Sequence, residues 1–207
     1  AGIHLFVDLR VDGFETIGNR YDNYFDLVTT NIPFGDIAVF DPSFSTSRNP
    51  TRKSVTKKIH NYYFLKALDV TRNGGIIAFI TSQGVMDTPG NSDVRREILS
   101  LADLITAVRF PNNLFTENAN TQVGSDLVIL RKNSSKQALT DAEEDFLNTV
   151  SEDGICTNRY FINRPDHIIH TSRQLSTDQY GKPAIIHHHK GGVSGIAQDL
   201  SAILLED

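Results

Sequence analysis

The sequence contains little cysteine and no long apolar run, and both absences limit the class of protein it encodes. Cys156 is the lone cysteine among 207 residues, which excludes an internal disulfide framework and a Cys-rich zinc site and suits a reducing cytoplasm. No segment approaches the roughly 18 uncharged apolar residues that a membrane-spanning helix needs. The first ten residues lack the basic region and apolar core of a signal peptide. We therefore expect a cytoplasmic protein without a membrane partner.

Charge is distributed unevenly along the chain. The net charge is −5, and the excess of acidic residues lies in residues 134–207. This balance excludes a strongly basic nucleic-acid-binding protein. One acid-free stretch is nevertheless basic, and it contains Arg48, Arg52, Lys53, Lys57 and Lys58. Such a cluster is typical of a solvated surface, and also of a loop that contacts phosphates.

Segments rich in β-branched residues alternate with segments of helical periodicity in the first two thirds of the chain. Strands are expected at residues 3–11, 25–30, 76–81, 104–110 and 126–131, and helices at 56–71 and 92–102. Asn73-Gly74-Gly75 is expected to end the first helix, and Ser92 to cap the second. The alternation predicts βαβ units and a largely parallel sheet. The last two strands are joined without a helix, which predicts an antiparallel pair at one edge.

The remaining residues, 134–207, predict an accessory α+β or helical extension to a domain formed by residues 1–133. Thr140 and Glu143 have the spacing of a helix capping box. Beyond it we expect two apolar strips around a turn and then a final amphipathic helix, at 167–171, 184–188 and 194–205.

Three adjacent histidines, His187-His188-His189, suggest a metal site at first sight. Successive residues of a strand point to opposite faces of a sheet, so the three rings cannot converge on one ion. We therefore expect no metal site here.

The strand expected at 25–30 runs directly into Asn31-Ile32-Pro33-Phe34. This tetrapeptide resembles motif IV, (Asn/Asp/Ser)-Pro-Pro-(Tyr/Phe), of the S-adenosylmethionine-dependent amino-methyltransferases, especially the adenine-N6 DNA methyltransferases. Ile32 departs from the proline that is usual at the second position, which removes rigidity but keeps the backbone carbonyl. Pro33 restricts its own backbone and that of the residue before it. Gly35 permits the tight turn that follows, and Asp36 is placed to cap a following helix.

The resemblance implies a chemical role for each residue of the motif. An exocyclic amine on a purine is a poor nucleophile because its lone pair is delocalised into the ring. Acceptors on the Asn31 side chain and the Ile32 carbonyl would bind its two N–H groups and free that lone pair for attack on a methyl sulfonium. Phe34 would stack on a base flipped out of the duplex.

Three further segments extend the resemblance over about 110 residues: 60–87, 94–115 and 121–132. They are similar to the units that follow motif IV in the modification subunits of type I restriction systems, and closer still to the methylase regions of bacterial mobile-element methylase–helicase proteins. The implied fold class is α/β. It would contain strands 4, 5, 6 and 7 of a Rossmann-like class I methyltransferase sheet, with an antiparallel edge pair, and a small C-terminal extension. The implied partner is DNA, and the basic cluster directly after the motif becomes a candidate phosphate contact.

The cofactor half of such an enzyme is missing from the sequence. The family binds S-adenosylmethionine on a Gly-rich loop after the first strand, and no such loop precedes residue 25. Asp12, Gly13 and Phe14, where the third strand would end, are weak candidates for contacts to the cofactor's adenine. A target-recognition region is also absent. Because the first residue is Ala rather than Met, we expect an excised C-terminal half that is inactive on its own.

The family's strand order, 3-2-1-4-5-7-6, raises a question about the edge of the truncated sheet. The strand at 25–30 normally pairs with strand one, which the sequence lacks, and an unpaired edge promotes association. We expect residues 3–11 to move inward and pair with it, because a tethered strand has a high effective concentration. The alternative is a homodimer formed edge to edge.

Two other functions remain open. Glutamine-N5 and guanine-N2 methyltransferases use a similar motif, because an amide or amino nitrogen presents the same chemical problem. Phe34 and the segment 110–115 favour adenine in DNA. The second alternative is a catalytically inactive methyltransferase fold that serves as a DNA-binding or scaffolding module.

Overall fold

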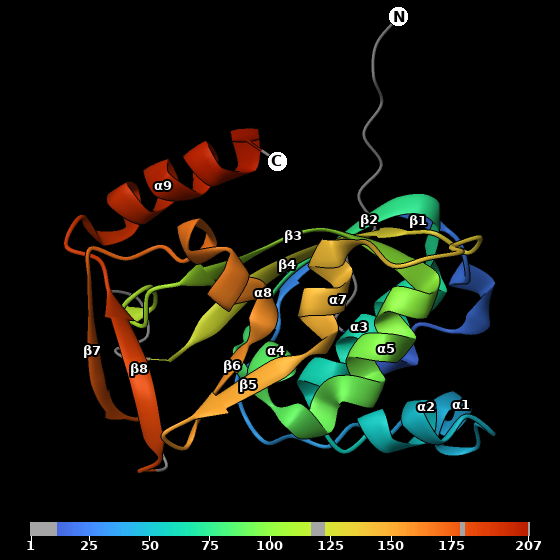
Figure 1. Cartoon of the computed structure of the whole chain (residues 1–207). Helices are drawn as coiled ribbons and strands as arrows, with labels where there is room; N and C mark the ends of the chain where they lie inside the picture. Colours follow the sequence, from blue (N-terminus) through green and yellow to red (C-terminus); the bar gives the residue numbers. More distant parts are fainter. Residues whose placement is uncertain (1–11, 117–122, 179–180, 207) are drawn as a thin grey trace, which may run out of the picture.

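A mixed sheet of four strands lies at the centre of the structure, a computed structural model that describes residues 12–116, 123–178 and 181–206 (Figure 1). The strands are β1 (Phe25–Asn31), β2 (Thr71–Ser82), β3 (Ala102–Phe110) and β4 (Ser125–Lys132), in the order β1-β2-β4-β3. β1 is parallel to β2, and β4 is antiparallel to both β2 and β3. This order corresponds to strands 4, 5, 7 and 6 of the family. The predicted fold class and the antiparallel pair at the edge are therefore confirmed.

Helices cover one face of this sheet (Figure 1). They are α3 (Ile59–Val70), α5 (Ser92–Leu101), α7 (Asp141–Leu147) and α8 (Arg159–Asn163). β2 alternates between buried and half-buried residues from Gly75 onwards, as a strand with one core-facing side must. Phe79 on that side packs against Phe64 of α3, with 5.2 Å between ring centres and the rings tilted by 58°. The same hydrophobic cluster includes Phe146 and Phe161, so α7 and α8 of the C-terminal region pack on the core of the sheet.

The opposite face of the sheet is only partly covered. Helix α9 (Gly192–Glu206) places Ile196 in a cluster with Val108 and Phe110 of β3. Leu27 of β1, which pairs with Ile76, is 56% exposed on this face. Among the helices of the described ranges, none is long and apolar enough to span a membrane.

The outer edge of β1 faces no strand among the described residues, where β2 is its one partner. The predicted inward movement concerns residues 3–11, which lie outside the described residues. Pairing by that segment and pairing by a second chain both stay predictions.

Two hairpins belong to the C-terminal region: β5 (Thr149–Glu152) with β6 (Ile155–Asn158), and β7 (Ser172–Thr177) with β8 (Pro183–His188). The prediction that residues 167–171 form the first strip of the second hairpin is wrong. That segment is instead fixed to β3, where the Ile169 N–H donates to the Arg109 carbonyl oxygen at 2.9 Å. β7 is exposed along its whole length, so no apolar pattern marked it in the sequence. The capping box of Thr140 and Glu143 is confirmed at the start of α7.

The remaining elements are single turns or short helices. They are η1 (Phe14–Thr16), η2 (Asn19–Tyr21), α1 (Pro42–Ser45), α2 (Pro50–Val55), α4 (Gly84–Asp87), η3 (Pro89–Asn91) and η4 (Pro165–His167). α1 and α2 were not expected, although the sequence carries a signal for both. Asp41 and Asn49 each precede a proline and accept hydrogen bonds from the first turn of the helix.

Two details of the predicted helix ends are wrong. α3 ends at Val70, and Asn73-Gly74-Gly75 lies inside β2. The pairing of β1 with β2 is irregular at this point, because Phe25 pairs with Thr71 whereas Leu27 pairs with Ile76. The glycines form this irregularity: Gly74 has φ +78°, and a Cβ on Gly75 would lie 3.0 Å from the Asp26 carbonyl oxygen. Ser92 is the first residue of α5 and not its cap. Asn91 holds the cap position, with its side chain hydrogen-bonded to the Gly84 carbonyl oxygen.

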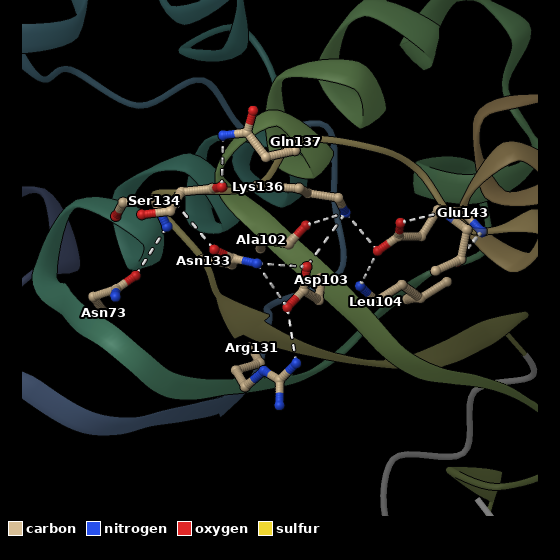
Figure 2. A network of polar contacts seen from close by, with 12 residues as sticks. Asn73, Ala102, Asp103, Leu104, Arg131, Asn133, Ser134, Lys136, Gln137 and Glu143 are labelled. Atoms are coloured by element: carbon tan, nitrogen blue, oxygen red, sulfur yellow. Dashed lines mark hydrogen bonds and ion pairs between the residues drawn. The ribbon is translucent and has the colours of Figure 1, made fainter.

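The segment after β4 is fixed to the sheet by polar contacts (Figure 2). Lys136 donates to the Ala102 carbonyl oxygen at 2.7 Å and forms an ion pair with Glu143, which also accepts from the Leu104 N–H. Asn133 donates to Asp103 at 3.0 Å. These bonds tie the expected boundary to β3 and α7. The division of the chain at residue 133 stays a prediction.

A buried arginine joins β3, β4 and α4. Arg109 contacts Asp126 at 2.8 Å and Asp87 at 2.9 Å, and its guanidinium lies 4.2 Å from the centre of the Phe161 ring. Asp126 is fully buried, so the arginine compensates a carboxylate that water does not reach. The arginine therefore links β3 to β4 and α4 through one buried charge.

We expect Arg109→Leu to lower the free energy of unfolding by about 3–5 kcal/mol, because it leaves buried Asp126 without its partner. Arg131→Leu is the matched control, since Arg131 on β4 is 56% exposed in its pair with Asp103. It should cost less than about 1 kcal/mol. Urea unfolding of the three proteins measures both values. Equal losses would show that the buried ion pair has no special role.

Candidate active site

The motif Asn31-Ile32-Pro33-Phe34 lies at the carboxyl end of β1. Ile32 is fully buried in the main hydrophobic cluster, and its N–H donates to the Ile80 carbonyl oxygen of β2 at 2.9 Å. A proline at position 32 has no N–H and could not form this bond. The isoleucine thus replaces the rigidity of the usual proline by a hydrogen bond and a buried side chain.

The residues on either side of Ile32 face outward. Asn31 and Pro33 are exposed, and Phe34 is half-buried. Gly35 has φ +152°, a value that favours glycine and allows the sharp turn after the motif. The prediction that Asp36 caps the next helix is wrong. Asp36 is exposed and followed by irregular chain, and α1 is capped by Asp41.

Asp41 is the centre of a buried polar group behind the motif loop. It accepts hydrogen bonds from Tyr62 at 2.6 Å and Ser43 at 2.8 Å, and it lies 3.2 Å from the Lys66 ammonium. Burial alone would raise the pKa of this carboxyl, but the hydrogen bonds and Lys66 outweigh it and lower the pKa to about 2. The group stabilises the end of the motif loop and takes no part in the cavity.

Phe34 lies between two aromatic rings from distant parts of the chain. Its ring centre is 5.7 Å from that of His60 in α3 and 5.6 Å from that of Phe115 after β3. Phe115 ends the segment 110–115 that the family resemblance includes. The fold therefore brings two of the quoted segments together at Phe34.

A cleft of about 890 Å³ opens beside Phe34. Its walls come from the motif loop, the start of α3, the end of β2 and the hairpin of β7 and β8. The volume lies in the range of small-molecule sites, which is about 300–1,000 Å³. The end of a parallel strand is where ligands of open α/β sheets commonly bind.

The hairpin wall is anchored to the segment after β3. The His187 N–H donates to the Asn112 side-chain oxygen at 2.9 Å, and the Asn112 N–H donates to the His187 carbonyl oxygen at 2.8 Å. The Asn113 side chain makes two bonds with the backbone of His189, each 3.0 Å long: its amide nitrogen donates to the carbonyl oxygen, and its oxygen accepts from the N–H. Two adjacent asparagines thus fix the C-terminal region against the cleft. His187 and His189 are buried and His188 is exposed, as alternation along β8 predicts.

Two polar residues of the cleft were not identified from the sequence. His60 is buried, with Nδ1 2.9 Å from the Thr81 hydroxyl oxygen and 3.4 Å from the Ser82 N–H that donates to it. The Gln83 amide nitrogen is buried and has no hydrogen-bond partner among the described residues. His60 lies within the segment 60–87, but nothing in its local pattern distinguishes it from a core residue.

The predicted basic cluster is only partly free to meet a ligand. Arg52 forms an ion pair with Asp69, and its guanidinium stacks 4.4 Å from the Phe44 ring centre. The other four residues are exposed: Arg48, Lys53, Lys57 and Lys58. Of these, Lys58 lines the cleft.

Asp12, Gly13 and Phe14 stay a prediction as contacts to the cofactor. Asp12 and Gly13 are exposed, whereas Phe14 is half-buried, with its ring 4.9 Å from that of Tyr63. The described residues before β1 consist of two 3₁₀ turns, and none forms a Gly-rich loop after a strand. They fit no complete S-adenosylmethionine site. Within the described ranges there is also no group of three His, Cys, Asp or Glu residues that could hold a metal ion.

We expect the free energy of unfolding to fall as the pH drops from about 6.5 towards 4. Burial lowers the pKa of His60 and of His187 to about 4, so the unfolded chain binds protons in this window that the folded chain does not. Urea unfolding at several pH values measures the slope, and His60→Phe should make it shallower. A wild-type slope equal to that of the variant would contradict the assignment for His60.

Three solved structures are similar to the chain at low identity. The M protein of the type I restriction enzyme EcoKI has 22% identity, covers 53% of this chain and 21% of its own, and gives a TM-score of 0.42. A modification subunit attributed to a type I restriction enzyme of Vibrio vulnificus YJ016 has 15% identity, 85% and 39% coverage and a TM-score of 0.45. The type IIG restriction endonuclease BpuSI has 16% identity, 74% and 21% coverage and a TM-score of 0.43.

The chain therefore spans well under half the length of these structures. Among curated proteins, no sequence matches it significantly. The family model of the N-6 DNA methylases matches residues 7–179, which is most of the chain. The protein belongs to the N-6 DNA methylase family.

Proposed function

We propose that this chain is the target-base half of a DNA methyltransferase that transfers a methyl group from S-adenosylmethionine to adenine N6. The observation that carries the proposal is the end of β1, where an exposed Asn31 and a buried Ile32 lead directly to a half-buried Phe34 that lines a cleft. The family match supports the reaction class. The fold of the relatives supports a larger parent, which would supply the cofactor site and a target-recognition region.

The chemistry assigned to this chain concerns the target nitrogen. The Asn31 side-chain oxygen and the Ile32 carbonyl oxygen accept hydrogen bonds from the two N–H groups of N6. These bonds draw the nitrogen towards tetrahedral geometry and localise its lone pair, an effect that grows in the transition state. S-adenosylmethionine would supply an electrophilic methyl group from a sulfonium. Transfer of that methyl group to the nitrogen would leave one extra proton, which would pass to solvent because an amide and a carbonyl are not bases at neutral pH.

Base extrusion and backbone binding are assigned to two further groups. Phe34 stacks on the flipped base. Arg48, Lys53, Lys57 and Lys58 are exposed just after the motif and contact phosphates of the duplex. Arg52, the fifth residue of the predicted basic cluster, is the weakest candidate for a phosphate contact, because Asp69 already neutralises its charge.

Transfer of a tritiated methyl group tests the proposal in the full-length parent. The substrates are duplex DNA, RNA and a release factor with its glutamine, so that the alternative substrate classes are tested in the same assay. Incorporation into DNA is expected. Incorporation into protein or RNA alone would overturn the DNA assignment, and none at all would support an inactive module.

We expect Asn31→Ala to lower turnover of the parent by about 100-fold or more, since it deletes an acceptor required in the transition state. Thr29→Ala is the matched control, because Thr29 is exposed on the same strand and the same face two residues earlier. Its turnover should stay near that of the wild type. Wild-type turnover in Asn31→Ala would show that this motif is not the site of methyl transfer.

Phe34→Ala should weaken binding of duplex DNA by about 5- to 150-fold, the equivalent of the roughly 1–3 kcal/mol of one base-stacking contact. Phe34→Tyr, which keeps the ring, should bind nearly as well as the wild type. Equilibrium titration with labelled DNA gives both affinities. Equal affinities for Phe34→Ala and the wild type would exclude stacking by this ring.

This chain alone should bind S-adenosylmethionine weakly or not at all, because the described residues do not form a site for it. Isothermal calorimetry of residues 1–207 measures the affinity. A micromolar dissociation constant would contradict the assignment of the cofactor site to the rest of the parent.

A further inference from the structure

His60 forms part of the cleft wall next to the motif. It lies in the first turn of α3, and its ring is tilted by 56° against that of Phe34 at 5.7 Å between centres. The ring is held by β2, through the hydroxyl of Thr81 and the N–H of Ser82. Those two residues directly follow Ile80, whose carbonyl oxygen accepts the Ile32 N–H. His60 is thereby fixed to the end of β2, next to the residue that pairs with the end of β1.

The two ring nitrogens of His60 have different tasks. A backbone N–H can only donate, so Nδ1 is the acceptor of the Ser82 bond and the ring proton resides on Nε2. Burial lowers the pKa of the ring to about 4, which keeps it neutral near pH 7. No group among the described residues accepts a hydrogen bond from Nε2. Nε2 is also not fully enclosed, because the enclosed polar atoms without a partner do not include it. The Nε2–H group therefore faces the cleft.

A second donor lies in the same wall. The Gln83 side chain extends over Gly124, where a Cβ would lie 2.1 Å from the Gln83 amide oxygen. Its amide nitrogen is enclosed and unpaired among the described residues. Unpaired buried donors are rare in folded proteins and commonly mark a ligand site. Two donors, one in α3 and one at the residue that follows β2, thus point to a ligand with acceptor atoms.

An adenine held by its amino group presents such atoms. N1 and N7 lie on the two sides of the carbon that carries N6, and both are acceptors without hydrogen. We propose that His60 donates a hydrogen bond from Nε2 to one of these ring nitrogens and so selects the target base by the acceptor next to its amino group. This inference rests on the proposed function. It makes His60 a specificity-determining residue, which reads the base and leaves the methyl transfer itself to Asn31 and Ile32.

A packing role for His60 makes a different prediction. If the ring only fills space between Phe34 and β2, its replacement by phenylalanine should change kcat/KM by the same factor for every target base. A ring that reads an acceptor would lose its effect only when that acceptor is removed. The two roles are therefore separated by changing the ring and the base together.

The experiment measures kcat/KM of the full-length parent on duplexes whose target adenine is unmodified, 1-deazaadenine or 7-deazaadenine. Each analogue replaces one ring nitrogen by C–H. The wild type should lose about 10-fold on one analogue, the cost of an unmet hydrogen bond to a fixed donor. His60→Phe should lose about 10-fold on unmodified DNA and show no further loss on that same analogue. His60→Gln, which keeps a neutral N–H donor, should retain part of the discrimination and serves if His60→Phe fails to fold.

Equal penalties for the analogue in the wild type and in the His60 variants would overturn the inference, as would the absence of any penalty in the wild type. Neither result affects the proposed function, because methylation of unmodified adenine is measured in the same series. No methylation of unmodified DNA by the wild type would instead overturn the proposed function and the inference with it.

Discussion

The hydrogen bond from the Ile32 N–H to the Ile80 carbonyl oxygen is the contact on which the candidate site depends. It extends the parallel pairing of β1 and β2 by one residue into the motif and places the Ile32 side chain in the core. The neighbouring Asn31 then projects outward, because successive strand residues alternate between faces.

The cleft beside this contact is assembled from segments that are far apart in the sequence. β2 contributes its carboxyl end, α3 its first turn, and the C-terminal hairpin the opposite wall. Asn112 and Asn113, which follow β3, form four hydrogen bonds with the backbone of His187 and His189, so the C-terminal region is part of the site's construction. The buried pairs of Arg109 with Asp87 and Asp126 hold the elements behind it. The C-terminal region thus contributes to the proposed target-base site as a wall.

The sequence predicted the sheet well because each strand of the first two thirds carries an apolar face. The family resemblance supplied their order, which periodicity alone does not determine. The hairpin strand β7 was missed because all six of its residues are exposed and its stability comes from pairing with β8. The sequence predicts a helix stop at glycines 74 and 75, but the structure uses the same residues for an irregularity of β2.

Prediction of the site was limited in a similar way. Asn31 and Phe34 belong to a contiguous motif and could be found by reading along the chain. His60 and Gln83 join them only through the contact of α3 with the end of β2. Arg52 looked equivalent to its basic neighbours, and its ion pair with Asp69, 17 residues away, became evident only in the fold.

The central claim is that the end of β1 presents the exocyclic nitrogen of adenine for methylation. Mass spectrometry of nucleosides from DNA treated with the full-length parent and S-adenosylmethionine tests it most directly, because it identifies the methylated atom. The account predicts N6-methyladenine as the modified nucleoside, and none of it from DNA treated with the Asn31→Ala variant. Methylation of a different base, or N6-methyladenine formed equally by the variant, would contradict it.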